Sequence, residues 1–151
     1  YQNDTRIQAR DWALSELKPS DKILVYAELM RLPVNSAAVD ELKSIDPAAV
    51  RKTDEAGAVL NRTDIPYALN LYAVQNKTFL QNLAAYARSR GYKYLIVDAS
   101  YNESVPGAAL IKKFDGLGDG LSIANSSFIS PLSALFASKS LGPTIFIYQL
   151  P

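Results

Sequence analysis

The sequence contains no histidine and no cysteine in its 151 residues. These absences exclude a Ser-His or Cys-His nucleophile, a thiol redox pair and the usual zinc site built from histidine and cysteine. Any chemistry in this chain therefore has to use carboxylates, lysine, tyrosine or serine.

The chain also lacks an excess of charge of either sign: 16 Lys and Arg face 15 Asp and Glu, a net charge of +1. This balance gives no electrostatic footprint for nucleic acid or for an anionic membrane surface. The longest uncharged stretch, residues 120–138, is interrupted by Asn125 and Pro131, so no segment is predicted to span a membrane. With 48% hydrophobic residues, a chain of this length can bury a core of its own. We expect residues 1–151 to form one soluble domain that does not bind nucleic acid.

Short apolar runs bounded by turn residues alternate with helical patterns along the chain. The runs predict strands over residues 22–27, 92–99 and 144–150, and a strand or edge hairpin over residues 67–74. Capping residues predict helices that begin at residues 3–5, Ser36, Asp46-Pro47, Asn76 and Ser130-Pro131. The helix from Asn76 is expected to end at Gly91, in the left-handed conformation that glycine tolerates.

This alternation predicts the fold class. Strands that are apolar throughout are typical of sheets covered on both faces. Helices between such strands indicate parallel pairing with crossover connections. We therefore expect an α/β fold, a small three-layer sandwich with a mainly parallel central sheet and helices on both faces.

Polar residues follow two of the predicted strands. Glu28 comes directly after the first strand, and Asp98, Ser100, Tyr101 and Asn102 lie at the end of the second. Because ligands of parallel sheets usually lie beyond the carboxyl ends of the strands, these five residues are the candidate ligand-binding site. Glu28 and Asp98 could form a carboxylate pair that binds a cation or a sugar hydroxyl, or they could cap loops and neighbouring helices.

A glycine-rich run at residues 116–120 is similar to half of a phosphate-binding loop. A dinucleotide loop needs its glycines between the end of a strand and the start of a helix, but Lys112-Lys113-Phe114 before the run is not a convincing strand. A calcium loop is not supported either, because Asp115 and Asp119 lack the terminal glutamate of that motif. We interpret the run as a flexible turn and expect neither a cofactor nor a metal.

The nine tyrosines raise the question of a carbohydrate-stacking surface. Tyr26, Tyr94 and Tyr148 lie in predicted strands, and Tyr86 lies in a predicted helix. We therefore interpret most of the tyrosines as residues of the core or its rim.

Three segments, in order along the chain, carry a resemblance to a known family. Asp4-Thr5-Arg6, with Ala9, Trp12 and the residues Leu-Lys-Pro-Ser-Asp-Lys-Ile-Leu-Val at 17–25, resembles a "DTR…A…W…LP.GSKILV" segment. That segment follows the last membrane helix in polytopic bacterial glycosyltransferases of the protein mannosyltransferase and aminoarabinose transferase type. Residues 91–100 (Gly-Tyr-Lys-Tyr-Leu-Ile-Val-Asp-Ala-Ser) resemble the family's "YDYVVLSS" strand. Residues 141–150 (Leu-Gly-Pro-Thr-Ile-Phe-Ile-Tyr-Gln-Leu) resemble its closing "GPTIRIYRL" strand.

The resemblance implies a multi-helix enzyme that moves a sugar from a polyprenyl-phosphate donor to an acceptor at the extracytoplasmic face of the bacterial cell membrane. Its catalytic carboxylate typically lies in the first extracytoplasmic loop, so the resemblance assigns no catalytic residue to this chain. The chain starts at Tyr1 without an initiator methionine, and we expect it to be a fragment of such a membrane protein. The domain would be an accessory part that caps the membrane-embedded part of the same polypeptide. It would otherwise contact the polyprenyl-phosphate sugar or the acceptor glycan or protein.

Two departures from the family pattern leave other functions open. Residues 32–74 match nothing in it, and Asp21 replaces the usual glycine of the turn. A second hypothesis is a stand-alone α/β domain that binds a sugar or a nucleotide at the strand ends around Glu28 and Asp98. A third is a hydrolase that uses these two carboxylates, although no nucleophile or base motif supports it.

Overall fold

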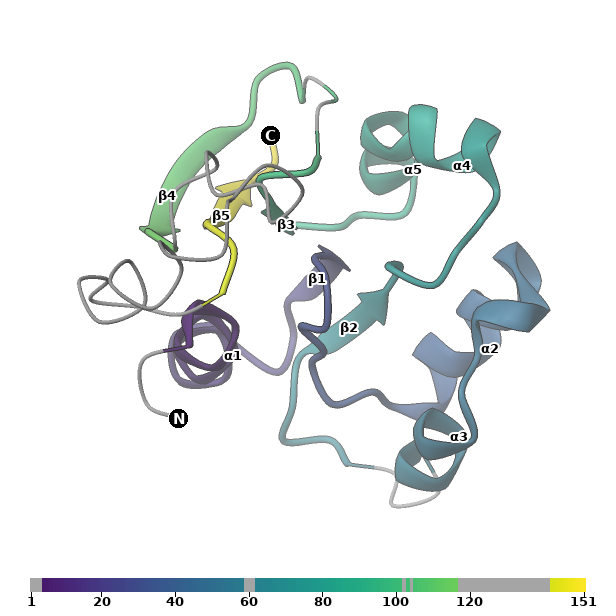
Figure 1. Ribbon diagram of the computed structural model, residues 1–151. Coiled ribbons are helices and arrows are strands. Elements are labelled where there is room, and N and C mark those ends of the chain that lie inside the picture. The colour runs from purple at the N-terminus through teal and green to yellow at the C-terminus, as the bar shows by residue number, and fades with distance from the viewer. Residues whose placement is uncertain (1–3, 59–61, 102, 104, 117–141) are drawn as a thin grey trace, which may run out of the picture.

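The computed structural model describes residues 4–58, 62–101, 103, 105–116 and 142–151. Within them the chain is an α/β protein with a five-stranded mixed sheet in the order β2-β1-β3-β5-β4 (Figure 1). The strands are β1 (Lys22–Tyr26), β2 (Tyr67–Asn70), β3 (Tyr94–Asp98), β4 (Ala109–Phe114) and β5 (Ile145–Gln149). The helix predicted from Ser130-Pro131 and most of the predicted glycine-rich turn lie outside the described residues.

The sheet has a parallel half and an antiparallel half. β1 pairs in parallel with both β2 and β3, whereas β5 runs antiparallel to its neighbours β3 and β4. The expectation of a mainly parallel sheet is therefore correct for β2, β1 and β3 and wrong for β5. An apolar run indicates that a strand is buried on both faces, but it does not encode the direction in which the strand runs.

β4 has no counterpart among the predicted strands, although Lys112-Lys113-Phe114 belongs to it. It lies at the edge of the sheet and is exposed along most of its length, so it lacks an apolar run. A register shift between Leu110 and Lys112 also interrupts the alternation of its side chains. Its conformation comes from pairing with β5, a tertiary contact that the local pattern does not carry.

The described helical segments are α1 (Thr5–Glu16), α2 (Ser36–Ile45), the 3₁₀ helix η1 (Pro47–Ala49), α3 (Lys52–Ala58), α4 (Lys77–Gln81) and α5 (Leu83–Ser89). Side chains of Asp4, Asn35 and Asn76 cap three of them by accepting a hydrogen bond from a backbone N–H of the first turn. Ser36, the predicted cap of α2, is instead its first residue. Among the described residues, no helix combines the length and apolar character that crossing a membrane requires.

The single helix predicted from Asn76 to Gly91 is divided at Asn82, where α4 and α5 meet. Asn82 Nδ2 donates to the carbonyl oxygen of Thr78 at 2.9 Å. Such bonds from side chain to backbone compete with the helical ladder. Gly91 has a φ of 69°, which confirms the predicted left-handed residue after the helix.

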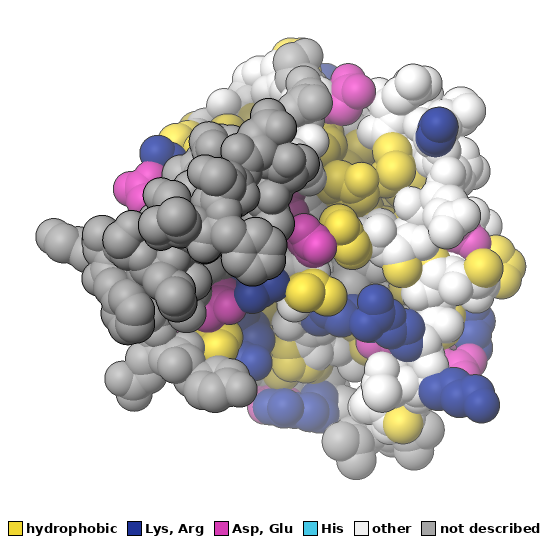
Figure 2. All heavy atoms as spheres, viewed as in Figure 1, with side chains coloured by type: hydrophobic (Ala, Val, Ile, Leu, Met, Phe, Trp, Pro, Cys, Tyr) yellow, Lys and Arg dark blue, Asp and Glu magenta, His cyan; other side chains and the backbone are white. Residues whose placement is uncertain are grey.

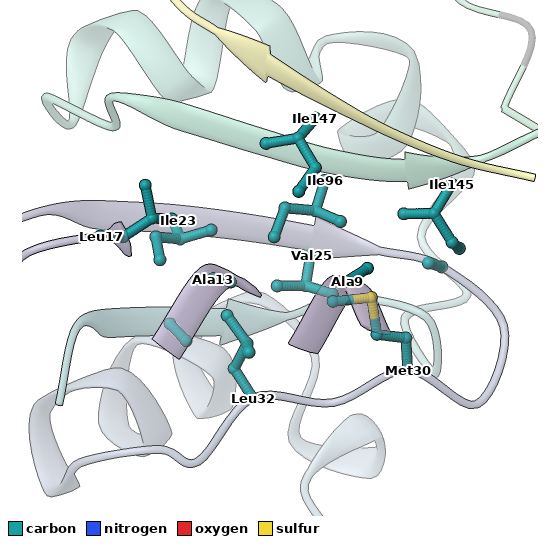
Figure 3. Packing of buried hydrophobic residues seen from close by; sticks show 12 residues of the cluster. Ala9, Ala13, Leu17, Ile23, Val25, Met30, Leu32, Ile96, Ile145 and Ile147 are labelled. Atoms are coloured by element: carbon teal, nitrogen blue, oxygen red, sulfur yellow. The ribbon is translucent and has the colours of Figure 1, made fainter. Parts of the chain in front are cut away.

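One face of the sheet packs against α1 (Figure 3). Ala9 and Ala13 of this helix are fully buried, and their small side chains allow the helix to lie close to the strands. The cluster joins α1 to β1, β3 and β5 and contains Ala9, Ala13, Leu17, Ile23, Val25, Ala27, Met30, Leu32, Ala68, Ile96, Ile145 and Ile147. Burial of one such aliphatic side chain contributes about 1.5–3 kcal/mol, so this cluster is a main source of stability.

A second cluster includes residues of α2 and α5. In β1, Leu24 belongs to this cluster while its neighbours Ile23 and Val25 belong to the first, as the two-residue period of a strand requires. The cluster contains Leu24, Leu42, Ala49, Leu69, Leu71, Val74, Leu83, Ala87, Tyr92, Leu95, Val97 and Leu150. The two hydrophobic clusters therefore lie on opposite faces of the sheet.

The N-terminus of α1 contacts the segment that enters β5. Thr5 Oγ1 donates to the carbonyl oxygen of Pro143 at 2.6 Å, across 138 positions of sequence. Gly142 has a φ of +92°, and a Cβ at this residue would lie 2.7 Å from Thr5 Oγ1 and 2.9 Å from Asp4 Oδ1. Arg6 Nε and Nη2 donate to the two carboxylate oxygens of Asp4 at 2.9 and 2.6 Å. The start of α1 thus contacts the segment before β5 through one hydrogen bond and through close packing of Asp4 and Thr5 against Gly142.

Candidate functional site

Asp98, the last residue of β3, joins two loops at the carboxyl end of the parallel strands. Its side chain is buried, with 3% of the residue exposed. Asp98 Oδ2 accepts from the backbone N–H of Glu28 at 2.6 Å. Asp98 Oδ1 accepts from the backbone N–H of Ser100 at 2.9 Å and also from Ser100 Oγ. These contacts are those of a carboxylate that caps loops.

Glu28 meets Asp98 through its backbone, and Glu28 itself is exposed. The structure therefore brings these two predicted site residues together without using the Glu28 carboxylate in the contact. Ser100 and Tyr101 lie in the same turn, in which the Tyr101 N–H donates to the carbonyl oxygen of Asp98 at 3.1 Å. Asn102, the fifth predicted residue, lies outside the described residues.

Three tyrosines meet where the parallel strands end. Tyr26 ends β1, Tyr72 follows β2 and Tyr101 follows β3. The Tyr26 and Tyr101 rings make an edge contact, with centroids 5.8 Å apart and planes at 64°. The Tyr26 and Tyr72 rings are tilted, with centroids 6.0 Å apart. Aromatic pairs favour such edge and tilted arrangements, so the three rings support one another at this edge of the sheet.

Two neighbouring cavities open beside these rings, and both are lined by Tyr101 and Glu103. The larger, of about 350 Å³, is also lined by Val97, Ala99, Val105, Phe146 and Tyr148. The smaller, of about 220 Å³, is also lined by Tyr26, Lys77, Leu80, Gln81 and Ser100. We call the two together the Tyr101 cleft. Hydrophobic side chains gather between helices α4 and α5 and the β3–β5 side of the sheet (Figure 2).

The Tyr72 and Tyr101 hydroxyls at this edge remain protonated at neutral pH. Burial raises the pKa of Tyr101, and the charge of Glu103 and the neighbouring Tyr26 raise it further. Burial also raises the pKa of Tyr72, together with the charges of Glu28 and Asp98. These two hydroxyls can therefore donate hydrogen bonds. In the described part of the chain, no group of three carboxylates is placed to hold a metal ion.

A second polar cluster, which the sequence analysis did not identify, lies near the opposite ends of the strands. Tyr67 and Tyr86 both donate from their hydroxyls to the carboxylate of Glu41, a residue of α2. Burial opposes ionisation of Glu41, but the hydrogen bonds from Tyr67 and Tyr86 outweigh it and lower the pKa of the carboxyl group. Lys22 Nζ lies 4.8 Å from the ring centroid of Tyr67 and 4.5 Å from that of Tyr92. Tyr67 and Tyr92 lie at the starts of predicted strands, so the sequence could have indicated that they share one edge of the sheet. No feature of the sequence indicates that Glu41 lies beside them.

Comparison of Tyr92 with Tyr67 tests the hydrogen bonding of this cluster. Tyr92 is 3% exposed, and its hydroxyl makes no hydrogen bond to the described residues. Tyr92→Phe removes an unpaired buried polar group, so we expect it to leave the free energy of unfolding unchanged or to raise it by about 1 kcal/mol. Tyr67→Phe instead deprives Glu41 of a donor, and we expect it to cost about 1–2 kcal/mol. Urea denaturation measures both, and a Tyr92→Phe loss equal to that of Tyr67→Phe would show that the Tyr92 hydroxyl is bonded.

Comparison of the chain with models of protein families, with curated proteins and with solved structures finds no match. The residues of the Tyr101 cleft offer aromatic faces, hydrogen-bond donors and acceptors, and one charge of each sign. Such a surface is suited to binding a ligand.

Proposed function

We propose that this chain is a non-catalytic, extracytoplasmic accessory domain of a membrane glycosyltransferase that uses a polyprenyl-phosphate sugar. It caps the membrane-embedded part of the same polypeptide or contacts the acceptor. The observation that supports this most strongly is the contact between two of the three family-like segments. Thr5, in the first segment, donates to Pro143, in the last.

The three segments also form one continuous part of the structure. They contribute β1, β3 and β5, which are consecutive neighbours in the sheet, and α1, which packs against them. Chance matches scattered along a chain have no reason to fold against one another. Matches that belong to the shared core of a family are expected to do so, and this favours the resemblance.

The arrangement of the remaining residues is compatible with the same proposal. Residues 32–74, which do not match the family pattern, supply α2, η1, α3 and the edge strand β2. An edge can differ between relatives without disturbing the central strands. Because α1 belongs to one core and α2 and α5 to the other, we also propose that the whole chain is a three-layer α/β sandwich.

The accessory role is supported by how the carboxylates at the strand ends are used. Asp98 is buried and bonded to backbone N–H groups of two loops, so it is not free to act as an acid or base. Glu28 is exposed, and its carboxylate takes no part in the contact with Asp98. A sugar transfer would then depend on residues of the membrane part.

An experiment on the parent protein tests this division of roles. Membranes that contain the parent are expected to transfer sugar from a polyprenyl-phosphate donor, and deletion of residues 1–151 is expected to lower transfer at least about tenfold. The isolated chain is expected to show no transfer and no hydrolysis of the donor. Turnover by the isolated chain that disappears in Glu28→Gln would contradict the proposal and favour the hydrolase instead.

The Tyr101 cleft favours a second candidate, a stand-alone domain that binds a sugar or a nucleotide. A ligand that binds only the folded state raises the melting temperature, by an amount that grows as the ligand concentration exceeds the dissociation constant. A thermal-shift screen with sugars, sugar phosphates and nucleotides therefore tests this candidate. The absence of any stabilisation by these compounds would count against it.

A further inference from the structure

We propose that the Tyr101 cleft binds an uncharged saccharide, with one face of the sugar against the Tyr101 ring and its hydroxyl groups bonded to polar side chains of the rim. This assigns a ligand class to the acceptor-contacting role. The proposed function determines only where the saccharide comes from, namely the acceptor. Whether the chain itself binds a saccharide can be tested without the proposed function.

The lining of the cleft has the two kinds of surface that a sugar ring presents. Tyr101 borders both cavities, so its ring side can contact the C–H groups of a ligand that spans them. Ser100, Gln81 and Glu103 offer a hydroxyl, an amide and a carboxylate, which can accept from or donate to sugar hydroxyls. Cavities of about 350 and 220 Å³ are of the order of those that hold small ligands.

The charges around the cleft disfavour an ionic ligand. Lys77 and Glu103 line the smaller cavity together, so their charges oppose one another. A phosphate would face the Glu103 carboxylate, and a cation would face the Lys77 ammonium group. An uncharged ligand avoids both costs, so nucleotides and sugar phosphates fit the cleft less well.

The binding surface is also held in place before any ligand arrives. Asp98 fixes the start of the Ser100–Tyr101 turn through two bonds to Ser100, and the Tyr101 N–H bonds to the Asp98 carbonyl oxygen. Tyr26 supports the Tyr101 ring from the side. Because these bonds order the turn in the free protein, ligand binding loses less entropy there. The loop-capping role of Asp98 is thus the means by which the site is positioned.

Saturation-transfer difference NMR on the full chain tests the proposal, with methyl α-D-mannopyranoside and maltotriose as uncharged probes. Glucose 1-phosphate and glucosamine serve as charged probes of similar size. We expect saturation transfer to ring protons of an uncharged probe, with dissociation constants of about 1 mM, and weaker binding of both charged probes. No transfer to either uncharged probe at 20-fold this concentration, or tighter binding of glucose 1-phosphate, would overturn the proposal.

Variants locate the ligand within the cleft. Tyr101→Ala is expected to weaken binding at least about tenfold, whereas Tyr72→Ala, which removes a neighbouring tyrosine outside both cavities, is expected to change it less than about twofold. Gln81→Ala alters an exposed residue of α4, so it leaves the fold intact and is expected to weaken binding about threefold or more. Equal losses in Tyr72→Ala and Tyr101→Ala, or unchanged binding in Gln81→Ala, would overturn the assignment. A parent protein without membrane spans would refute the proposed function and leave this result standing.

Discussion

Gly116→Ala is expected to destabilise the chain by about 3 kcal/mol or more. A Cβ on Gly116 would lie 2.2 Å from the carbonyl oxygen of Gly142, 2.4 Å from the carbonyl carbon of Pro143 and 2.6 Å from the nitrogen of Thr144. All three atoms belong to the backbone, so no side-chain rotation relieves the overlap. The Gly116 N–H also donates to Thr144 Oγ1 at 3.1 Å. The change should therefore separate the end of β4 from the start of β5.

Gly57→Ala is the matched control for this prediction. Gly57 lies in α3, and a Cβ there has no neighbour within 4 Å. Alanine is favoured over glycine in a helix by up to about 1 kcal/mol, so the control is expected to be neutral or slightly stabilising. Urea denaturation of both variants gives the comparison. A Gly116→Ala variant within about 1 kcal/mol of the unaltered chain would contradict the close packing of these two segments.

Asp98→Asn should have the second large effect, a loss of about 2–4 kcal/mol. The carboxylate accepts from the backbone N–H groups of Glu28 and Ser100 and from Ser100 Oγ. The asparagine side chain has the same shape, but its NH2 group replaces one of the two accepting oxygens. This NH2 group would face an N–H or O–H donor of Glu28 or Ser100 without an acceptor. The two loops should then open, and amide hydrogen exchange at Glu28 and Ser100 should accelerate together with the loss of stability.

Glu28→Gln provides the control for the Asp98 prediction. Glu28 is exposed and contributes its backbone N–H rather than its carboxylate to the contact. Surface changes of this kind usually alter stability by less than about 0.5 kcal/mol. If Asp98→Asn proves as stable as Glu28→Gln, the loops at the carboxyl end are held by other contacts. That result would contradict the inference that Asp98 positions the turn that lines the Tyr101 cleft.

The strands and helix ends were predictable from the sequence because their signals are local. Apolar runs predict β1, β3 and β5 to within two residues at each end, since burial on both faces leaves no place for polar side chains. Asp4 and Asn76 cap their helices as predicted, because a short acceptor side chain satisfies the free N–H groups of the first turn. The direction of β5 and the existence of β4 depend on which strands meet, which local residues do not specify.

The candidate site was predictable in position but not in role. The rule that strand ends gather at one edge correctly predicts that Glu28, Asp98 and Ser100 lie together. Their roles depend on whether each residue contributes its backbone or its side chain to the contact. The loop conformations determine this, and the sequence pattern does not predict them. Tyr26 and Tyr148, interpreted from their strands as core or rim residues, also line the cleft. The cluster around Glu41 was not predicted, because α2 reaches it only through tertiary packing.

The contact between the first and last family-like segments is the link between fold and proposed function. Thr5, Gly142 and Pro143 come from opposite ends of the described chain and meet within bonding distance. Residues that carry the resemblance therefore hold the first helix against the segment that enters β5. This is what an accessory domain requires if its chemistry is supplied by another part of the polypeptide.

The reading frame upstream of Tyr1 in the parent gene decides whether this chain belongs to a membrane glycosyltransferase. We expect this frame to encode about ten hydrophobic segments, each long enough to cross a bilayer at roughly 20 residues. We also expect an acidic residue in the first extracytoplasmic loop. A frame without such segments would contradict the assignment to a membrane glycosyltransferase.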